Sequence, residues 1–367
     1  MRHILLIQLI LALSLQTIYA DNITVSGSVS GTWECDTVFV SDDIDIEVGD
    51  SLIIRPGVYV AFASTHSLYV RGYIRAEGTA DNRITFDVMD TTDFSNDTLA
   101  KGGWNGIHFY YNGYTPDSSI FDFCAFYHGK AVSLDSIEEH GGAMCLRDID
   151  RLRISNCIFE NNFARYNGGA IHMEESDVLI KDNLFVANRC GPTEEPWGYG
   201  GAICCDHSDA RITGNYFYDN TSTGVGGAVA VRFMESMINN NIFAGNHSAL
   251  GGAIGFLHYY EYPYTHCNNL MHGNSATFFG GAIANLDCGP THVNYTLTGN
   301  ISVYGGAFYV KDSLVPNVYN TIMYDNYAQE GPEVYLWDAY ASANFYYCDI
   351  KGGIEAFSGS GGVGFMG

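Results

Sequence analysis

The sequence has few basic residues for its length. Lysine and arginine total 17 against 41 aspartates and glutamates, which gives the 367 residues a formal net charge of −24. Because proteins bind nucleic acid largely by neutralising phosphates with cationic side chains, this balance argues against a nucleic-acid partner. It also argues against an anionic polysaccharide unless a cation bridges the two surfaces. Ca²⁺ or a basic partner stays compatible with the charge, and so does a surface that is acidic only for solubility.

Long apolar runs are missing after the first twenty residues. Arg2, an apolar run over 4–15 and a small residue, Ala20, before Asp21 are typical of a secretory signal peptide, so we assign 1–20 to one. The apolar run is shorter than the roughly 20 residues that span a bilayer. We therefore expect no transmembrane segment after cleavage, and an exported monomer that is secreted or lies at the cell surface.

The ten cysteines do not form a compact disulfide framework. Small secreted domains use closely spaced cysteines as staples, whereas a strand-rich core of this length does not need them. We expect one or two bridges at most, and the best-placed pair joins Cys190 to Cys204 or Cys205 across a loop. The other thiols are predicted to be buried.

No stretch shows the apolar stripe of an amphipathic helix. From 21 to about 75 the chain has short runs in which apolar and polar residues alternate, such as 44–48, separated by Gly and Asp. Alternation with a period of two predicts strands. The Asp- and Thr-rich segment 87–100 is predicted to be a loop between strands. The protein is therefore predicted to be all-β.

A paired signature recurs through the second half of the chain. A large apolar residue three positions before an asparagine is followed, about nine residues after the apolar residue, by Gly-Gly-Ala. The apolar and asparagine pairs are Phe159/Asn162, Phe185/Asn188, Phe217/Asn220, Phe243/Asn246, Met271/Asn274, Leu297/Asn300 and Met323/Asn326. The Gly-Gly-Ala triplets begin at Gly141, Gly168, Gly200, Gly226, Gly251, Gly280 and Gly305. Copies spaced 25 to 32 residues apart predict a solenoid in which each repeat is one coil.

Coils of two or three short strands, stacked about 4.8 Å apart, make a parallel β-solenoid. About a dozen coils would fill 21–367, of which 141–334 carries the regular repeats. The apolar residues are predicted to stack as an internal ladder. Their asparagines form a second ladder at a turn, because Asn tolerates the left-handed conformation and passes amide hydrogen bonds between coils. The Gly-rich end, 358–367, offers no polar cap, so we expect that the chain is truncated or that something covers this end.

Two sets of motifs resemble known exported proteins. G-T-A-D-x-x-I-T-F at 78–86 and G-x-W-x-G-I-x-F at 102–109 look like the opening coils of secreted bacterial right-handed parallel β-helices. The combination of F-x-x-N and G-G-A-[ILV] over roughly 141–334 resembles the passenger repeats of the chlamydial polymorphic outer membrane proteins. This resemblance implies a single-stranded right-handed parallel β-helix that is exposed at the outer membrane and serves adhesion to host cells.

Two insertions, 189–199 and 257–267, interrupt the repeat and are predicted to project from the rim of the solenoid. Their aromatic rings suit stacking on sugar rings, and their acids suit hydrogen bonds from hydroxyl groups. The alternative is that the rings fold back over the flank of the solenoid. The candidate ligand-binding residues are Trp197, Tyr199, Tyr259, Tyr260, Tyr262, Tyr264, Glu194 and Glu261.

Acidic residues recur nine positions after the start of four consecutive triplets. Like charges one coil apart would repel, and bound Ca²⁺ or partial protonation would relieve the repulsion. The alternative is that each acid starts a strand through an Asx turn and points into water. These acids suggest calcium as a cofactor, and no cofactor is required. The candidate calcium ligands are Asp150, Asp177, Asp209 and Glu235.

A second column of potential ligands lies four residues after three of the triplets. Cys145, His172 and Cys204 are predicted to stack there. Soft ligands on adjacent coils suit Zn²⁺, but cysteine is also often a small buried hydrophobe. Both interpretations stay open.

Recognisable catalytic motifs of pectin-cleaving β-helix enzymes are missing. The sequence has no N-T-D, G-H-G or R-x-P-x-x-R, and the pair Asp42 and Asp43 has no partner motif. Paired carboxylates for glycoside hydrolysis would have to assemble in space along one edge of successive coils. The candidates are Asp148, Glu174, Glu175 and Asp206.

These observations favour an exported, non-enzymatic β-helix protein used for adhesion or glycan binding. Its partner would be an extracellular glycan or a protein on a host or other cell surface. The alternative is a polysaccharide lyase or glycoside hydrolase that acts on an extracellular polysaccharide.

Overall fold

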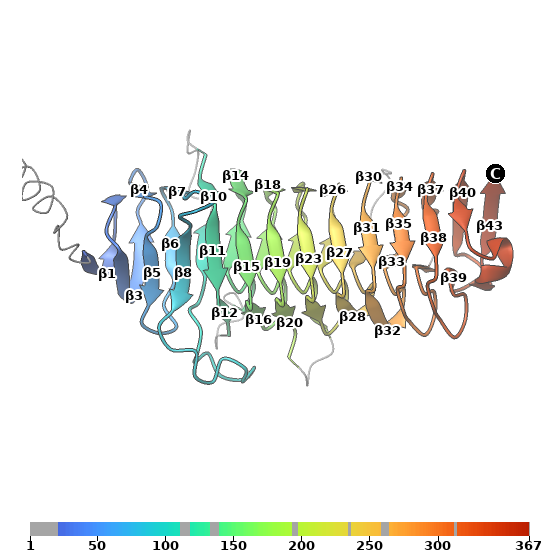
Figure 1. The fold of residues 1–367 in the computed structure, drawn as a ribbon, viewed down its shortest axis with the longest axis horizontal. Helices are drawn as coiled ribbons and strands as arrows, with labels where there is room; N and C mark the ends of the chain where they lie inside the picture. The colour runs from blue at the N-terminus through green and yellow to red at the C-terminus, as the bar shows by residue number, and fades with distance from the viewer. Residues whose placement is uncertain are drawn as a thin grey trace, which may run out of the picture.

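The computed structural model describes residues 21–110, 118–132, 139–192, 197–233, 236–257, 264–311 and 314–366, so the predicted signal peptide, 1–20, lies outside the described residues. Short strands stack in parallel along one axis, with the N-terminal coils at one end and the C-terminal coils at the other (Figure 1). The fold is a single-stranded right-handed parallel β-helix, as predicted. No helix in these ranges is long and apolar enough to cross a membrane.

Two long faces of the solenoid share strand β3 (Thr37–Ile46), which turns a corner and pairs with both, and β1 (Asn22–Ser28) stacks on β3. The first face contains β5 (Tyr59–Phe62), β8 (Ile84–Val88), β11 (Cys124–Tyr127), β15 (Ile158–Glu160), β19 (Leu184–Val186), β23 (Tyr216–Tyr218), β27 (Ile242–Ala244), β31 (Leu270–His272), β35 (Thr296–Thr298), β38 (Ile322–Tyr324) and β41 (Asp349–Ile350). The second face contains β6 (Leu68–Val70), β9 (Ile107–Tyr110), β13 (Met144–Arg147), β17 (Ile171–Glu174), β21 (Ile203–Asp206), β25 (Val229–Arg232), β29 (Ile254–Leu257), β33 (Ile283–Leu286), β36 (Phe308–Lys311), β39 (Val334–Leu336) and β42 (Phe357–Gly359).

Two further faces close each coil. The third face contains β2 (Gly31–Trp33), β4 (Ser51–Ile54), β7 (Tyr73–Glu77), β10 (Ile120–Asp122), β14 (Asp150–Ser155), β18 (Asp177–Lys181), β22 (Arg211–Thr213), β26 (Met237–Asn239), β30 (Thr265–Cys267), β34 (Thr291–Val293), β37 (Asn317–Tyr319), β40 (Ser342–Tyr346) and β43 (Gly362–Met366). The short fourth face contains β12 (Lys130–Ala131), β16 (Phe163–Ala164), β20 (Arg189–Cys190), β24 (Thr221–Ser222), β28 (His247–Leu250) and β32 (Ser275–Phe279). A 3₁₀ turn, η2 (Gly353–Ala356), precedes β42.

The predicted apolar ladder is present inside the first face. Phe159, Phe185, Phe217 and Phe243 pair in register on consecutive coils, with ring centroids 4.8, 4.8 and 4.7 Å apart. All four rings are fully buried. Offset stacking of aromatic rings adds to the hydrophobic gain from burying them, so this column holds the coils in register.

The predicted asparagine ladder is also present, at the turn that follows the first face. From Asn162 to Asn300, each side-chain amide donates from Nδ2 to Oδ1 of the asparagine on the next coil, at 2.8 to 2.9 Å, and Asn326 is the last acceptor. The predicted conformational reason was wrong. The left-handed residue is the one before each asparagine, for example Asp219 before Asn220.

A second ladder of asparagines, which the sequence did not lead us to expect, precedes the first face. Asn183, Asn215, Asn241 and Asn269 donate from coil to coil at 3.0, 3.0 and 3.2 Å, and Asn269 then donates to the hydroxyl of Tyr295 at 2.9 Å. Both ends of every strand on this part of the first face are therefore tied to the next coil.

The Gly-Gly-Ala triplets form the tight turn that leads into the second face. Gly200 has a left-handed φ of +71°, and a Cβ on Gly201 would lie 2.1 Å from the carbonyl oxygen of Gly227 on the next coil. Only glycine fits this close approach of backbones. Ala202, the third residue, is fully buried.

None of the ten cysteines, all of which lie in the described ranges, is in a disulfide. The predicted bridge from Cys190 to Cys204 or Cys205 is therefore wrong. Cys190 packs with alanines on the fourth face, whereas Cys205 faces the core from the second face. Because adjacent strand residues point to opposite sides, Cys204 faces away from the core that Cys205 enters.

Candidate functional site

A groove of about 410 Å³ lies on the outer side of the second face. In each strand there, the first and third residues face the core and the second and fourth face outward, as the core positions of Val229 and Val231 in β25 show. The outward residues of successive coils therefore form two columns that run along the solenoid axis. A third column comes from the residues just before each Gly-Gly-Ala turn.

The column formed by the second residue of each strand lies in the middle and consists of small residues over three coils. Ala230, Gly255 and Ala284 occupy it in register, and Tyr309 follows them. A Cβ on Gly255 would lie 2.1 Å from Cγ1 of Val225, so the neighbouring column leans over these small residues. This arrangement hollows the surface between the two outer columns.

Apolar and aromatic side chains form the two walls of the groove. One wall contains Tyr199, Val225, Leu250 and Phe279, which pair in register on successive coils. The opposite wall contains Leu257, Leu286, Lys311 and Trp337, of which the first three also pair in register. Asp287 adds the one acidic side chain among the described residues of the lining.

The rings at the C-terminal end of the groove pack against one another. The Phe279 ring centroid lies 4.6 Å from that of Tyr309 and 5.2 Å from that of Trp337, which meets it edge to face. Trp337 is still 42 % exposed, and Trp197, another lining residue, is 55 % exposed. The groove thus offers two accessible indole faces on a rigid aromatic support.

A short network fixes Tyr199 at the other end of the groove. The guanidinium of Arg232 lies 4.5 Å from the centre of the Tyr199 ring. Nη1 of Arg232 lies 3.0 Å from Oδ2 of Asp206, and Oδ1 of Asp206 lies 2.9 Å from Nδ1 of His207. A cation held over a ring face attracts it electrostatically, so this network orients the ring.

The groove gathers only part of the aromatic residues proposed from the sequence. Trp197 and Tyr199 line it, whereas Tyr264 packs against the core. The remaining candidates, which lie outside the described residues, are Glu194, Tyr259, Tyr260, Glu261 and Tyr262.

Sequence reasoning missed Phe279, Tyr309 and Trp337 as lining residues. A signal for Tyr309 was available, because it lies four residues after the triplet that starts at Gly305, in the column of Cys145 and His172. Trp337 has no such signal, because Gly-Gly-Ala is replaced by Gly-Pro-Glu at 331–333 in its coil.

The proposed catalytic carboxylates lie N-terminal to the groove. Glu174 pairs in register with Asp206, and Asp148 lies one position further along its own coil, beyond Arg147. Nε of Arg147 lies 3.2 Å from Oε2 of Glu174. With Arg232 beside Asp206, each of the two paired carboxylates already has a cationic partner.

The proposed calcium ligands on three coils do lie side by side. Asp150 pairs with Asp177, and both line an acidic hollow of about 380 Å³ together with Asp209. All three are exposed, and Oδ1 of Asp177 lies 3.5 Å from Nη2 of Arg211. Glu235 lies outside the described residues. Calcium binding here stays a prediction.

Cys145, His172 and Cys204 pair in register as predicted, and all three are buried. Burial raises the pKa of the Cys204 thiol and lowers the pKa of His172. The ring of His172 stacks on that of His140 at 4.7 Å. The buried positions are compatible with packing as small hydrophobic side chains, and zinc binding by this column stays a prediction.

Comparisons with known proteins agree with this architecture. Residues 83–261 match the family model described as "Right handed beta helix region". A stretch of 103 residues, 28 % of the chain, is 32 % identical to the metabotropic glutamate receptor-like protein R of Dictyostelium discoideum, and it spans only 6 % of that protein. The family match and the stacked parallel strands together support a right-handed β-helix built from repeats.

Proposed function

We propose that this protein is exported and binds an extracellular glycan in the aromatic groove of its second face, in the service of adhesion. The observation that carries this proposal is the pair of accessible indoles, Trp197 and Trp337, at a groove lined by apolar side chains. Ligand sites are typically concave and apolar with a few polar groups that fix orientation. Asp287 and Lys311 are such groups here.

The shape and charge of the groove favour a linear, neutral glycan. Its walls follow the solenoid axis across several coils, whose spacing of about 4.8 Å is similar to the length of one sugar ring in an extended chain. Among the residues that the structure describes, the lining has one acid and one lysine, and the whole chain carries a formal charge of −24. An acidic polysaccharide would be repelled by the protein as a whole.

Binding is favoured over cleavage by the position of the carboxylates. Glu174 and Asp206 each lie beside an arginine, and neither lines the groove. A glycoside hydrolase needs two carboxyl groups that flank the bond it breaks, one of them protonated. A lyase or hydrolase is therefore the second candidate, and the experiment below distinguishes it.

Substitution of a groove tryptophan tests the proposal. Trp337→Ala and Trp197→Ala should each weaken binding to a neutral polysaccharide about five- to tenfold, because a lost aromatic platform costs about 1 kcal/mol or more. Affinity electrophoresis or calorimetry against a panel of neutral and acidic polysaccharides measures the change. Tyr347→Ala is the matched control, because Tyr347 is 71 % exposed and is not among the groove-lining residues.

Two outcomes would contradict the proposal. If all three variants bound the polysaccharide equally well, the ligand would bind outside the groove. Release of reducing or unsaturated chain ends that is abolished by Glu174→Gln or Asp206→Asn would identify an enzyme instead.

A further inference from the structure

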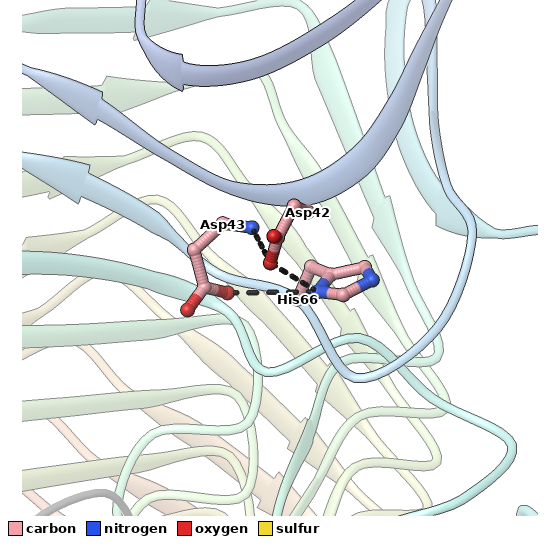
Figure 2. A group of neighbouring side chains, drawn as sticks. All are labelled: Asp42, Asp43 and His66. Carbon is pink, nitrogen blue, oxygen red and sulfur yellow. Dashed lines mark hydrogen bonds and ion pairs between the residues drawn. The ribbon is translucent and has the colours of Figure 1, made fainter.

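Three potential metal ligands meet at the corner where β3 passes from the first face to the second. Asp42 and Asp43 lie within β3, and His66 lies on the next coil, two residues before Leu68, which pairs with Ile44. Figure 2 shows the two carboxylates and the imidazole turned toward one another. Within the described ranges, this is the group of His, Cys, Asp and Glu whose ligand atoms all lie within 4.8 Å of one another.

The distances in this group suit a shared cation better than a hydrogen bond. Nδ1 of His66 lies 3.6 Å from Oδ1 of Asp42 and 3.7 Å from Oδ1 of Asp43. Both separations are too long for a hydrogen bond. Two ligand atoms that each lie about 2.1 Å from a tetrahedral zinc ion, and about 109° apart around it, are themselves about 3.4 Å apart, which is close to both separations. The geometry points to a divalent transition-metal site formed by Asp42, Asp43 and His66.

The carboxylates are held in position by their surroundings. Oδ1 of Asp42 accepts a hydrogen bond from the Asp43 N–H at 2.9 Å, and Oδ1 of Asp43 accepts one from the Ser67 N–H at 2.8 Å. Nδ2 of Asn105 donates to the buried Ser67 hydroxyl at 3.0 Å. Outer hydrogen bonds of this kind orient metal ligands before the ion binds.

Asn105 supplies an observation that is independent of the acids. It is 8 % exposed, and its Oδ1 is buried with no hydrogen-bond partner. Its backbone N–H donates to the His66 carbonyl oxygen at 2.9 Å, so it lies on the coil next to His66. A buried acceptor of this kind requires a donor. Because Nδ2 of the same side chain donates to Ser67, the residue after His66, this unpartnered oxygen belongs to a side chain that packs beside the group.

The ligand set indicates which ion the site takes. Ca²⁺ prefers six to eight oxygen ligands, whereas Zn²⁺ accepts imidazole nitrogen and carboxylate oxygen in a four-coordinate site. Asp42, Asp43 and His66 supply three such ligands, and solvent supplies the fourth. The side chains of Asp42 and Asp43 are 75 % and 52 % exposed, so the ion enters from solvent. Bound there, it would link β3 to the following coil and stabilise the N-terminal end of the solenoid.

Calorimetric titration of the purified protein with Zn²⁺ alone tests this site. We expect one ion per chain, and we expect His66→Ala and Asp43→Asn each to weaken binding about tenfold or more. Thermal unfolding should shift upward with Zn²⁺ in the wild type and not in these variants, because a ligand that binds only the folded state stabilises it. His272→Ala is the matched control, since His272 is an exposed histidine on the first face.

Either of two results would overturn the assignment. One is zinc binding that is absent, or that survives His66→Ala unchanged. The other is a response to Ca²⁺ equal to that for Zn²⁺ and insensitive to His66→Ala, which would leave the carboxylates acting alone. The site is independent of the groove, so glycan binding should persist in EDTA and in His66→Ala.

Discussion

Two histidines of the third face point into the apolar core. His266 and His292 pair in register on consecutive coils, and both are essentially unexposed. Burial lowers the pKa of His266 to about 3 and lowers the pKa of His292 well below its usual range. Neither nitrogen of His292 has a hydrogen-bond partner. A buried imidazole of this kind is tolerated only while it is neutral.

The stability of the protein should therefore fall as the pH falls below about 6.5. The histidines are then protonated in the unfolded chain but stay neutral in the folded core. The free energy of unfolding therefore falls by up to about 1.4 kcal/mol per pH unit for each such histidine. His292→Leu should remove one contribution and flatten the loss of stability between pH 7 and pH 5. Urea unfolding at the two pH values measures this slope, with His272→Leu as the exposed control. Equal slopes in the wild type and His292→Leu would contradict the argument.

At the scale of elements, the loop between β8 and β9 is tied down at several points. Asp97 accepts two hydrogen bonds from the Arg189 guanidinium, at 2.6 and 2.7 Å, across 92 residues of sequence. Nζ of Lys130 donates to the carbonyl oxygens of Asp93 and Lys101 at 3.0 and 2.7 Å. Burial lowers the pKa of this lysine to about 8. The loop therefore docks on the fourth face.

Loss of the two hydrogen bonds between Arg189 and Asp97 should loosen this loop without unfolding the solenoid. Arg189→Gln removes the paired hydrogen bonds and leaves the largely buried carboxylate of Asp97 unpaired, at a cost of about 1–3 kcal/mol. Hydrogen exchange and limited proteolysis of 89–101 measure the opening. Arg211→Gln, which removes an exposed contact of 3.5 Å with Asp177, should leave the loop unchanged. Exchange rates that are the same in both variants would show that Arg189 is dispensable.

Composition alone could predict that this loop exists but not which face of the solenoid it packs against. The Asp and Thr residues of 87–100 favour a turn region, and the sequence indicated a loop there. No local pattern around Arg189 indicates that its side chain contacts Asp97 in this loop. The contact depends on how many residues each intervening coil contains. The fourth face was missed for a similar reason, since β16 and β20 are only two residues long and show no alternation.

At the scale of the whole molecule, the repeat made the fold predictable because every coil supplies the same residues at the same turns. Phe217, Asn220 and Gly226 each have equivalents on the neighbouring coils, so the ladders could be written down from spacing. The groove was not predictable in this way. It depends on outward residues such as Gly255 and Tyr309, which differ from coil to coil.

A solenoid is stabilised chiefly by contacts between neighbouring coils, so a break in the middle should divide it. Asn220 donates to Asn246 Oδ1 at 2.9 Å and to the Phe185 carbonyl oxygen at 3.0 Å, and its Oδ1 accepts from Asn188 at 2.9 Å. Asn220→Ala would leave several buried polar groups unpaired at once. The expected cost is about 3 kcal/mol or more.

Urea unfolding followed by hydrogen exchange tests this expectation. Asn220→Ala should lower the free energy of unfolding and separate exchange of the coils before Asn220 from exchange of those after it. Asn344→Ala is the control, because Asn344 donates one amide hydrogen bond, to Asn317 at 3.1 Å, from a partly buried position, and should cost about 1 kcal/mol or less. A single cooperative transition that is lowered equally by both substitutions would mean that the ladder adds no more than an ordinary polar contact. Cooperativity would then come from the apolar column of Phe159, Phe185 and Phe217 alone.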